Sequence, residues 1–573
     1  MTRQQRRPRK TPEETPFSRR FRDELIATAT TRPDLFPEAS DGPAITGFRT
    51  ARLGLDTTAM PATQGGLSAL PVEPVLVVMK DDPDYPPRVY VNHGRFVGVP
   101  HVLTDGELCI YLDPQREWDP TIGAAGFLNR LHDWFADAID NRFDAATALY
   151  HPVGGRAHTS SGTPLIVCRD QLPDAELGFA KLVRVTATRN DLRLDDGRPA
   201  GGDDEKVLVI RAPRPLFAGP GASVREVFAN MGPELAVKAL LAWSKRIGRQ
   251  RRDRRDFAHL VLSVPSPAGA APYVMVGRLK LDGLDAAATS DAISALPIEW
   301  CRLDDQRPSI STRRDAHCPV RAYQGRDVAI VGCGGLGSWV AEFIARAGAR
   351  TLAVVDPATV KGGLLVRQDY TDGDVGYAKD QALARRLRSV APDCETTYGA
   401  AASERVFEIL HSEAGLVVDA TVSLAFGRRL DTLLASQERK SLAVRVATDV
   451  GTGSLGLVVV SAGGGLTLDC LDVAARNTIL LNGAMEAYHT LWQPAEHEEL
   501  VPAKGCSIPT FHGSAADMAA VSAEVVNLVA PHFEARVSGV HLFALPHSGS
   551  GPAHCFISSE AMGIVHTEPD DTH

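Results

Sequence analysis

Between residues 71 and 140, two apolar, strand-like runs are followed by a stretch with helical spacing. The strands flank a proline-rich turn in PVLVVMKDDPDYPPRVYV, and the helical stretch lies in REWDPTIGAAGFLNRLHDWF. Apolar residues three and four positions apart share one face of a helix. That spacing predicts a buried helix face made of Phe127, Leu128, Leu131, Trp134 and Phe135.

Shorter strand-like segments occupy residues 165–220, among them LIVCRD, KLVRVTATR and KVLVIRAP, and DDGRPAGGDDE is expected to be a loop. Helical periodicity follows over residues 224–247, and strands are expected near 258–280. We expect these segments to form a connecting domain of mixed structure, in which no chemistry can be identified.

A third stretch, residues 326–420, alternates strand and helix. Its segments are RDVAIVG, SWVAEFIARAGA, TLAVVD, KDQALARRLRSVA and LVVDA, and further strands are expected in LAVRVATD and LGLVVVSA. This alternation predicts an α/β domain with a mainly parallel sheet and helices on both faces.

The length of 573 residues is enough for several domains. We expect a flexible basic tail over residues 1–15 and domains over residues 16–150, 151–315 and 316–573. A hydrophobic content of 44% and a charged content of 23% are ordinary for a soluble globular protein. The absence of a long apolar run and of a secretory signal predicts a cytoplasmic protein that does not cross a membrane.

The net charge of −9 argues against a general nucleic-acid binder. One basic run, KRIGRQRRDRRD at residues 245–256, is expected to be a solvated helix face or a loop that contacts an acidic partner. The nine cysteines are odd in number and include no C-x-x-C pair, so a disulfide framework and a structural zinc site have no support. Single cysteines in special surroundings are therefore the candidates for chemistry.

A glycine-rich loop follows the first strand of the α/β stretch and opens a helix. Gly332, Gly334, Gly335 and Gly337 form G-x-G-G-x-G, and Asp356 ends the next strand 24 residues after Gly332. Glycines allow the backbone to approach a phosphate, the helix N-terminus supplies N–H donors, and a carboxylate can bind ribose hydroxyls. By itself the pattern fits a nicotinamide oxidoreductase as well as an adenylating enzyme.

Downstream residues favour adenylyl transfer. Arg367 and Lys379 are cations that suit phosphates, Gln368 lies beside the arginine, and Asp419 ends a strand where it can bind Mg²⁺. The order of these motifs resembles the ThiF/MoeB/ubiquitin-activating (E1-like) superfamily over roughly residues 325–545. The resemblance implies a Rossmann-like adenylation domain that binds ATP, in which Asp356 holds the ribose and Gln368 helps in the same pocket.

Two positions depart from that superfamily. Leu364 stands where the family usually has Asn, and Ala358 stands where it often has a second acid. The family also uses an upstream arginine, often from a dimer partner, and Arg313 or Arg314 is a candidate. The two departures keep open a non-catalytic scaffold with a degenerate nucleotide site.

Cys506 precedes Pro509, Thr510 and Gly513, and a helix with an apolar stripe follows (Met518, Val521, Val525 and Leu528). A thiol near a helix N-terminus is biased towards the nucleophilic thiolate. The arrangement resembles the catalytic loop of the compact activating enzymes of autophagy, which implies that Cys506 takes the acyl group from the adenylate. A buried inert cysteine is the alternative, and the rival thiol Cys470 has a strand-like setting that favours the core.

The N-terminal stretch resembles a ubiquitin-conjugating (E2-like) domain, which implies an α+β fold. The matching parts are Tyr85–Pro87, Val99–His101, Gly106–Cys109 and Trp118–Pro120. By this resemblance Cys109 carries the acyl group to its target. His101 replaces the family's Asn and is expected either to donate a hydrogen bond, to act as a base, or to satisfy a local carbonyl; Asp105 is a candidate to orient the nucleophile.

The order of the three parts resembles the fused E1–E2 proteins of bacterial anti-phage operons, notably CBASS. The resemblance implies ATP-dependent activation of a protein C-terminus, thioesters on Cys506 and then Cys109, and conjugation to an amine of a target protein. It implies a cGAS-like nucleotidyltransferase, or else a small ubiquitin-like protein, as the activated partner, and a homodimer. Sulfur-carrier activation for cofactor biosynthesis is the alternative that needs only the adenylation site.

Overall fold

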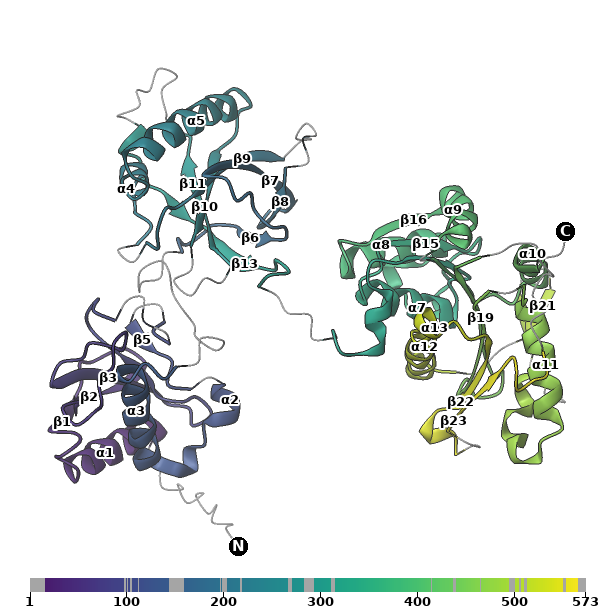
Figure 1. Ribbon diagram of the computed structural model, residues 1–573, viewed down its shortest axis with the longest axis horizontal. Coiled ribbons are helices and arrows are strands. Elements are labelled where there is room, and N and C mark those ends of the chain that lie inside the picture. The colour runs from purple at the N-terminus through teal and green to yellow at the C-terminus, as the bar shows by residue number, and fades with distance from the viewer. Residues whose placement is uncertain are drawn as a thin grey trace, which may run out of the picture. The chain divides into compact units, whose positions relative to one another are not determined.

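The computed structural model divides the chain into two compact units, Met1–Thr312 and Arg313–His573 (Figure 1). The predicted tail at residues 1–15 lies outside the described residues. The structure describes residues 16–96, 99, 101–103, 106–111, 113–143, 159–195, 197, 204–216, 219–265, 271–282, 293–310, 315–413, 415–435, 439–463, 465–493, 500–503, 506–509, 513–549 and 553–564.

Five antiparallel strands form one sheet of the N-terminal unit, in the order β1-β2-β3-β4-β5. Helices α1 and α3 contribute to one core with this sheet, and the predicted apolar face of α3 is buried throughout, which confirms the expected α+β arrangement. The bounds are α1 Phe17–Thr30, β1 Glu38–Asp41, β2 Phe48–Asp56, β3 Val72–Lys80, β4 Arg88–Tyr90, β5 Glu107–Leu108, α2 Pro114–Glu117, η2 Pro120–Ile122 and α3 Gly123–Ile139.

Eight strands form a second sheet of the same unit, in the order β12-β11-β10-β9-β7-β8-β6-β13, with both parallel and antiparallel pairs. This mixed sheet lies within residues 151–315, where a connecting domain is expected, and it belongs to the same compact unit as the first sheet. The bounds are β6 Leu165–Cys168, β7 Leu177–Thr186, β8 Arg189–Leu194, β9 Glu205–Arg211, α4 Val224–Ala229, α5 Pro233–Arg252, β10 Phe257–Val264, β11 Tyr273–Lys280, β12 Glu299–Trp300 and β13 Arg302–Asp305.

The single helical stretch expected over residues 224–247 is two helices, α4 and α5. Gly232 interrupts it with a φ of 78°, and Pro233 begins α5, where a missing N–H costs nothing. Strand β8 was missed because its sequence, RNDLRL, is polar at most positions. The basic run at residues 245–256 forms the end of α5 and the turn after it.

The C-terminal unit contains the predicted mainly parallel sheet, in the order β16-β15-β14-β17-β18-β19-β22-β23. The first five strands in this order, β16, β15, β14, β17 and β18, are parallel. β19, β22 and β23 continue the sheet, each antiparallel to the strand before it in the order. The bounds are β14 Asp327–Val331, β15 Thr351–Val355, β16 Glu395–Tyr398, β17 Gly415–Asp419, β18 Leu442–Thr448, β19 Leu455–Ser461, β22 Gly539–Ala544 and β23 His554–Ser558.

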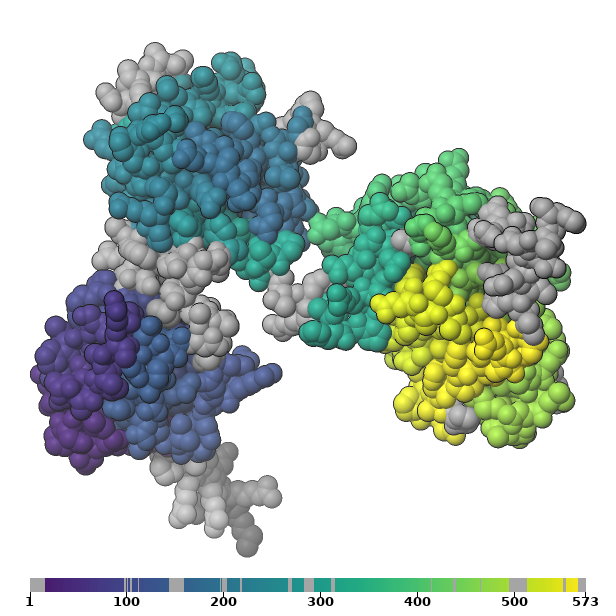
Figure 2. All heavy atoms as spheres, viewed as in Figure 1, coloured from purple at the N-terminus to yellow at the C-terminus, as the bar shows by residue number. Residues whose placement is uncertain are grey.

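Successive residues of β14 enter different cores, as expected for a sheet covered on both faces. Val328 and Ile330 pack in one core with α7, α8 and α12, whereas Ala329 and Val331 pack in another with α9 and α11. In Figure 2, α12, β22 and β23 (yellow) form one continuous surface of this unit. The helix bounds are α7 Gly335–Arg346, α8 Lys379–Val390, α9 Gly399–His411, α10 Leu424–Ala435, α11 Leu468–Leu480, α12 Ala515–Val529 and α13 His532–Ala535.

The short elements of this unit lie outside the main sheet. The 3-10 turns are Pro319–Tyr323, Gly362–Leu364, Asp372–Asp374, Gly483–Leu491 and Pro546–Ser548. Strands β20 (Leu500–Ala503) and β21 (Cys506–Pro509) form a separate antiparallel pair. Among the helices in the described ranges, none is long and apolar enough to cross a bilayer.

The chain reverses its direction across the sheet at β14. β15 and β16 lie on one side of β14, and β17 lies on the other, so Val331 pairs with Val355 and with Asp419. In open α/β sheets, ligands bind at such a switch point, beyond the carboxyl ends of the strands. The turn between β14 and α7 starts at Gly332, whose φ of 90° suits glycine.

Two glycines of this turn are required by close packing. A Cβ at Gly332 would lie 2.6 Å from the carbonyl oxygen of Ala420, and a Cβ at Gly337 would lie 1.8 Å from that of Gly332. A Cβ at Gly334 would have no heavy atom within 4 Å. The turn is therefore closed on its inner side and open at Gly334.

We expect Gly337→Ala to destabilise the C-terminal unit by on the order of 3 kcal/mol, because the backbone must move to admit the methyl group. Gly334→Ala is the matched control and should leave the melting temperature within about one degree, since its methyl group enters open space. Differential scanning calorimetry of the full chain measures both. Equal melting temperatures for the two variants would contradict this packing of the turn.

Candidate functional site

Asp356 is tied directly to the glycine turn. Its Oδ2 accepts a hydrogen bond of 2.8 Å from the N–H of Cys333, and its Oδ1 accepts one of 2.8 Å from the N–H of Ala358. Cys333 itself is fully buried, and burial raises the pKa of its thiol. The carboxylate at the end of β15 is thus fixed beside the loop, as the motif predicts, and Ala358 contributes through its backbone alone.

Lys379 lies at the same place, at the first residue of α8. Its Nζ is 3.9 Å from Oδ2 of Asp356, and both side chains are about nine-tenths buried. The hydroxyl of Tyr370 donates towards the carbonyl of Cys333 at 2.8 Å and also lies 3.3 Å from that of Lys379. Tyr370, which the sequence analysis missed, therefore joins the glycine turn to the start of α8.

Arg367 and Gln368 lie on a turn held by backbone hydrogen bonds. The N–H groups of both residues donate to the carbonyl of Leu364, at 3.1 and 3.0 Å. Arg367 is half-buried, and burial lowers the pKa of its guanidinium. Gln368 is buried, and within the described part of the chain its Oε1 has no hydrogen-bond partner.

Directly after Gln368, a buried carboxyl pair anchors the turn to both neighbouring helices. Asp369 lies beside Glu342 of α7, and Arg386 of α8 contacts both, with its Nη2 2.8 Å from Oδ1 of Asp369. Burial and the adjacent Glu342 raise the pKa of Asp369 to about 7. The sequence could have indicated only one of these three residues. Arg386 is seven residues after Lys379 and therefore lies on the same face of the helix.

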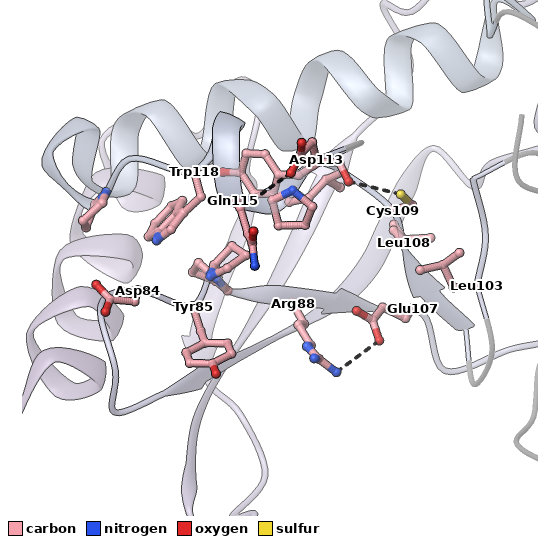
Figure 3. Close-up of a pocket in the computed structure, with 16 residues that line it drawn as sticks. Asp84, Tyr85, Arg88, Leu103, Glu107, Leu108, Cys109, Asp113, Gln115 and Trp118 are labelled. Carbon is pink, nitrogen blue, oxygen red and sulfur yellow. Dashed lines mark hydrogen bonds and ion pairs between the residues drawn. The ribbon is translucent and has the colours of Figure 1, made fainter. Parts of the chain in front are cut away.

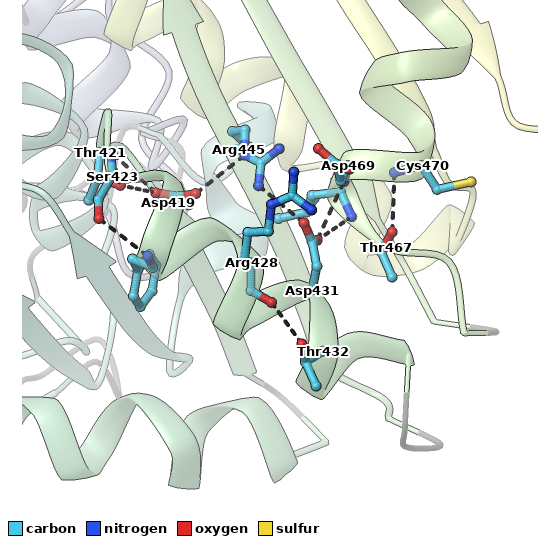
Figure 4. A network of polar contacts seen from close by, with 12 residues as sticks. Asp419, Thr421, Ser423, Arg428, Asp431, Thr432, Arg445, Thr467, Asp469 and Cys470 are labelled. Atoms are coloured by element: carbon cyan, nitrogen blue, oxygen red, sulfur yellow. Dashed lines mark hydrogen bonds and ion pairs between the residues drawn. The ribbon is translucent and has the colours of Figure 1, made fainter.

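Asp419 lies across β14 from Asp356 and is almost completely buried. Its Oδ1 accepts from the N–H and the hydroxyl of Thr421, at 3.1 and 2.7 Å, and its Oδ2 is 3.3 Å from Nε of Arg445. Arg445 also reaches Asp431 of α10 at 3.4 Å (Figure 4). Gly427 leaves room for this arginine, because a Cβ there would be 2.9 Å from its Nη2.

Asp431 continues the network to another helix. Its Oδ1 accepts the N–H of Leu468 at 2.9 Å at the start of α11, whose N-cap is Thr467 (Figure 4). Burial raises the pKa of Asp431 in spite of Arg445. Neither Arg445 nor Asp431 was identified from the sequence. Asp431 lies 12 residues after Asp419 and 14 residues before Arg445, and no sequence motif links these three positions.

Cys506 is the first residue of β21, where its backbone pairs with Ala503 of β20. Helix α12 begins at Ala515, with Ser514 and Asp517 forming a capping box. Cys506 is thus on a strand nine residues before the helix, and its side chain lies outside the described part of the structure, as do Arg313 and Arg314.

The expectation for Cys470 was wrong. It is exposed on the first turn of α11, where its N–H donates to the hydroxyl of Thr467 at 3.1 Å (Figure 4). The strand-like composition misled because the threonine caps a helix whose buried side is Leu468, Leu471 and Ala475.

In the N-terminal unit, Cys109 opens onto a cavity of about 930 Å³ (Figure 3). Its N–H donates to the carbonyl of His101 at 2.8 Å, and its Sγ lies 3.2 Å from the carbonyl of Tyr111. Three of the four sequence parts matched to the E2-like pattern line this cavity: Tyr85–Pro87, Glu107–Cys109 and the Trp118 segment. Burial, and then the carboxylates of Glu107 and Glu117, raise the pKa of the Cys109 thiol.

Tyr111 also lines the cavity and was not identified from the sequence. Burial raises the pKa of its hydroxyl to about 12, and the hydroxyl has no hydrogen-bond partner within the described residues. It therefore stays protonated at neutral pH and retains a free donor.

His101 supports the cysteine through its backbone. Its carbonyl accepts the Cys109 N–H, and its φ of 60° is a left-handed conformation that Asn, the family's residue, adopts readily. The imidazole is 3% exposed, packs edge-on against Phe143, and has an Nδ1 without a partner in the described ranges. Burial lowers the pKa of the imidazole, which favours its neutral form. Asp105 lies outside the described residues.

Replacing Arg445 should be costly because two buried carboxylates then lose their shared cation. We expect Arg445→Met to lower the free energy of unfolding by about 2–3 kcal/mol. Arg428→Met, an exposed arginine on the same helix as Asp431, is the control and should change it by less than about 0.5 kcal/mol. Urea unfolding measures both, and Asp431→Asn in the Arg445→Met background should recover part of the loss.

The raised pKa of Asp369 predicts a pH-dependent stability. A carboxyl whose folded pKa is about 7, above its ordinary 3.8, stabilises the fold fully below pH 3.8 and loses this contribution as the pH rises through 7. Asp369→Asn cannot ionise, so its melting temperature relative to wild type should increase between pH 4 and about pH 7.5, by the equivalent of at most about 4 kcal/mol, at about 1.4 kcal/mol for each pKa unit.

Glu342 and Arg386 lie beside Asp369 in the wild type, so the difference between the two melting curves reports the coupled titration of the Asp369–Glu342 pair. Asp372→Asn, which removes a carboxylate at an exposed position on the same segment, is the matched control. A constant difference for Asp369→Asn at all pH values would show that the pKa of Asp369 is not raised in the folded protein.

Comparison with known families assigns both outer parts of the chain. Residues 322–534 match the ThiF family, and residues 50–167 match Prokaryotic E2 family A. The ATP-dependent ubiquitin transferase-like protein Cap2 of Pseudomonas aeruginosa is 26% identical over 234 residues, which are 37% of this chain and 41% of that protein.

The tRNA threonylcarbamoyladenosine dehydratase of Escherichia coli is 38% identical over 79 residues, or 14% of this chain and 30% of that protein. The chain thus spans less than half the length of either relative. Among solved structures, E. coli MccB with ATP aligns with a TM-score of 0.29 and 14% identity over 42% of this chain and 66% of that one. The family matches make residues 322–534 a ThiF-family domain and residues 50–167 a prokaryotic E2-family domain of the same chain.

Proposed function

We propose that this chain activates the C-terminal carboxylate of a protein with ATP, carries the acyl group on Cys506 and then Cys109, and joins it to an amine of a target protein. One observation carries the proposal: a single polypeptide combines a ThiF-family domain, with its glycine turn at a sheet switch point, and an E2-family domain, with a cysteine that opens onto a cavity. The two chemistries are consecutive, and fusion raises the concentration of one thiol near the other.

The residues around the glycine turn fit a nucleotide. Gly334 is open on the side where a phosphate would approach the N-terminus of α7, and Lys379 and Arg367 provide positive charge. Asp356 keeps acceptor capacity for ribose hydroxyls, and the unpartnered Oε1 of Gln368 can accept a further hydrogen bond. Together they would align the substrate carboxylate with the α-phosphorus.

Asp419 is the residue that would hold Mg²⁺, which usually takes one or two protein carboxylates and completes its shell with phosphates and water. The ion would neutralise charge on the phosphates during displacement of pyrophosphate. Arg445 keeps the Asp419 carboxylate in one orientation through Oδ2. Leu364 contacts Arg367 and Gln368, and Ala358 contacts Asp356, through backbone atoms, which supports adenylation in spite of these two departures from the family.

The two cysteines would carry the acyl group one after the other. The thiol of Cys506 would displace AMP from the activated carboxyl, forming a thioester that preserves most of the activation. The thiol of Cys109 would then take the acyl group, and an amine would attack its carbonyl. His101 serves as a positioning residue, since its carbonyl rather than its buried ring contacts the Cys109 backbone.

The resemblance to fused E1–E2 proteins of anti-phage operons, and the similarity to a Cap2 protein, support antiviral signalling in the bacterial cytoplasm. We propose a cGAS-like nucleotidyltransferase as the activated protein, with a small ubiquitin-like protein as the alternative, and a homodimer as the working form. Sulfur-carrier adenylation would use the ThiF-family domain alone and would leave the E2-family domain without a role.

Intact-mass spectrometry tests the relay. The full chain is incubated with ATP, Mg²⁺ and the protein encoded beside it, in wild-type, Cys506→Ala and Cys109→Ala forms. We expect an adduct on Cys506 in the Cys109→Ala variant that excess thiol releases by acyl exchange, and no adduct on Cys109 in the Cys506→Ala variant, because Cys506 must load first. ATP–pyrophosphate exchange should persist in Cys506→Ala, since activation precedes the thiol.

Cys470→Ala is the matched control, because Cys470 is an exposed cysteine in the same unit that the relay does not use. It should load like wild type. Loading of Cys109 without Cys506 would refute the relay, and absence of pyrophosphate exchange with every candidate tail would favour a non-catalytic scaffold.

A further inference from the structure

The cavity beside Cys109 has an acidic lining. Three carboxylates, those of Asp84, Glu107 and Asp113, line it together with one cation, Arg88. The tail that arrives on Cys109 is bound through its thioester, so the cavity charge acts mainly on the second reactant. An acidic lining attracts a cation and repels an anion.

Glu107 is the carboxylate best placed to act on that reactant. It is two residues before Cys109, at the start of β5, and its negative charge is one cause of the raised pKa of the Cys109 thiol. Asp113 is occupied as the N-cap of α2, where it accepts the N–H of Gln115 at 3.2 Å. Figure 3 shows Asp84 at the opposite end of the cavity from Cys109.

One carboxylate oxygen of Glu107 contacts neighbouring side chains, and the other is left to accept a further hydrogen bond. Its Oε2 accepts from the hydroxyl of Tyr90 at 3.1 Å and lies 3.6 Å from Nη1 of Arg88 (Figure 3). Its Oε1 has no partner within the described residues. The carboxylate is therefore held in place through Oε2, and Oε1 keeps its capacity to accept a hydrogen bond in the lining of the cavity.

We propose that Glu107 recognises the acceptor, a lysine side chain that binds as an ammonium ion beside the Cys109 thioester. The inference rests on the proposed function, and it names the acceptor class of the same site. A hydroxyl or thiol acceptor is uncharged and could only donate a hydrogen bond to the carboxylate, whereas an ammonium ion would add the attraction of opposite charges to that hydrogen bond.

The transfer that follows balances without another reactant. The bound ammonium releases a proton to solvent, and its nitrogen attacks the thioester carbonyl. The C–N bond forms, the C–S bond breaks, and the sulfur leaves as a thiolate. The nitrogen loses a second proton to become an amide, and the thiolate takes up one proton, so the net products are the amide, the free Cys109 thiol and the one proton released to solvent. Because Glu107 stabilises the charged amine and not the attacking form, its effect belongs to acceptor binding, and it is a positioning residue for this step.

The chain supplies a matched control in Glu117. Like Glu107 it raises the pKa of Cys109, and the side chains are similarly exposed, 24% for Glu107 and 29% for Glu117. Glu117, however, does not line the cavity, and both of its oxygens have partners, the N–H of Asp113 and the guanidinium of Arg130. Glu117→Gln thus changes the field at the sulfur and leaves the acceptor position unchanged.

The experiment loads Cys109 of the full chain without ATP, by exchange with the 2-mercaptoethanesulfonate thioester of acetylglycine. Discharge is then followed by mass spectrometry of the Cys109 peptide, with Nα-acetyl-lysine amide or with hydroxylamine, which is uncharged at pH 7.5. We expect Glu107→Gln to raise the half-saturating lysine concentration by about tenfold, with discharge to hydroxylamine unchanged.

Glu117→Gln should discharge to both nucleophiles like wild type. Arg88→Gln should lower the half-saturating lysine concentration, because it removes the cation that competes for Glu107. Equal lysine discharge by Glu107→Gln and wild type would overturn the proposal, and so would an equal loss with lysine and hydroxylamine, which indicates a structural effect. Chemical loading bypasses the nucleotide, so either result is independent of whether ATP-dependent loading occurs.

Discussion

The candidate nucleotide site depends on the close approach of the backbone after β14 to its own helix and to the end of β17. The carbonyl of Gly332 lies where a Cβ of Gly337 would be, and Ala420 closes the other side. This approach aims the N-terminus of α7 at the open side of Gly334, and it brings Cys333 within 2.8 Å of the Asp356 carboxylate. If a methyl group at Gly337 displaced the turn, both the N-terminus of α7 and the Asp356 carboxylate that the proposed chemistry needs would therefore move.

The sequence was informative where the position of a residue in a local motif accounts for its place in the structure. The glycines, Asp356 and Asp419 lie at the carboxyl ends of adjacent parallel strands, as the strand–helix alternation predicts. It was uninformative where a role depends on a distant partner. Arg445 matters because it lies between Asp419 and Asp431, and Asp369 because it lies against Glu342 of another helix. Local composition also misled at Cys470, where one capping threonine turns an apparent strand into a helix.

The electrostatics around Cys109 bear on why a nucleotide would be needed in the same chain. Burial and two nearby carboxylates disfavour its thiolate, so this thiol is a weak spontaneous nucleophile towards an unactivated carboxylate. The same negative charge favours a cationic acceptor once the sulfur carries an acyl group. A site with this charge suits the last step of a relay better than the first, which places the demand for activation on the ThiF-family domain.

The substitution of Leu364 for the family's Asn bears on whether that domain can still activate a carboxylate. The orientation of Arg367 and Gln368 is set by the Leu364 carbonyl, which accepts both of their N–H groups, and by Asp369, which Arg386 anchors to α8. None of these contacts uses the side chain at position 364. The cation at Arg367 therefore keeps its place in spite of the change, because the turn that carries it is held by backbone atoms and by Asp369, independently of the side chain at position 364.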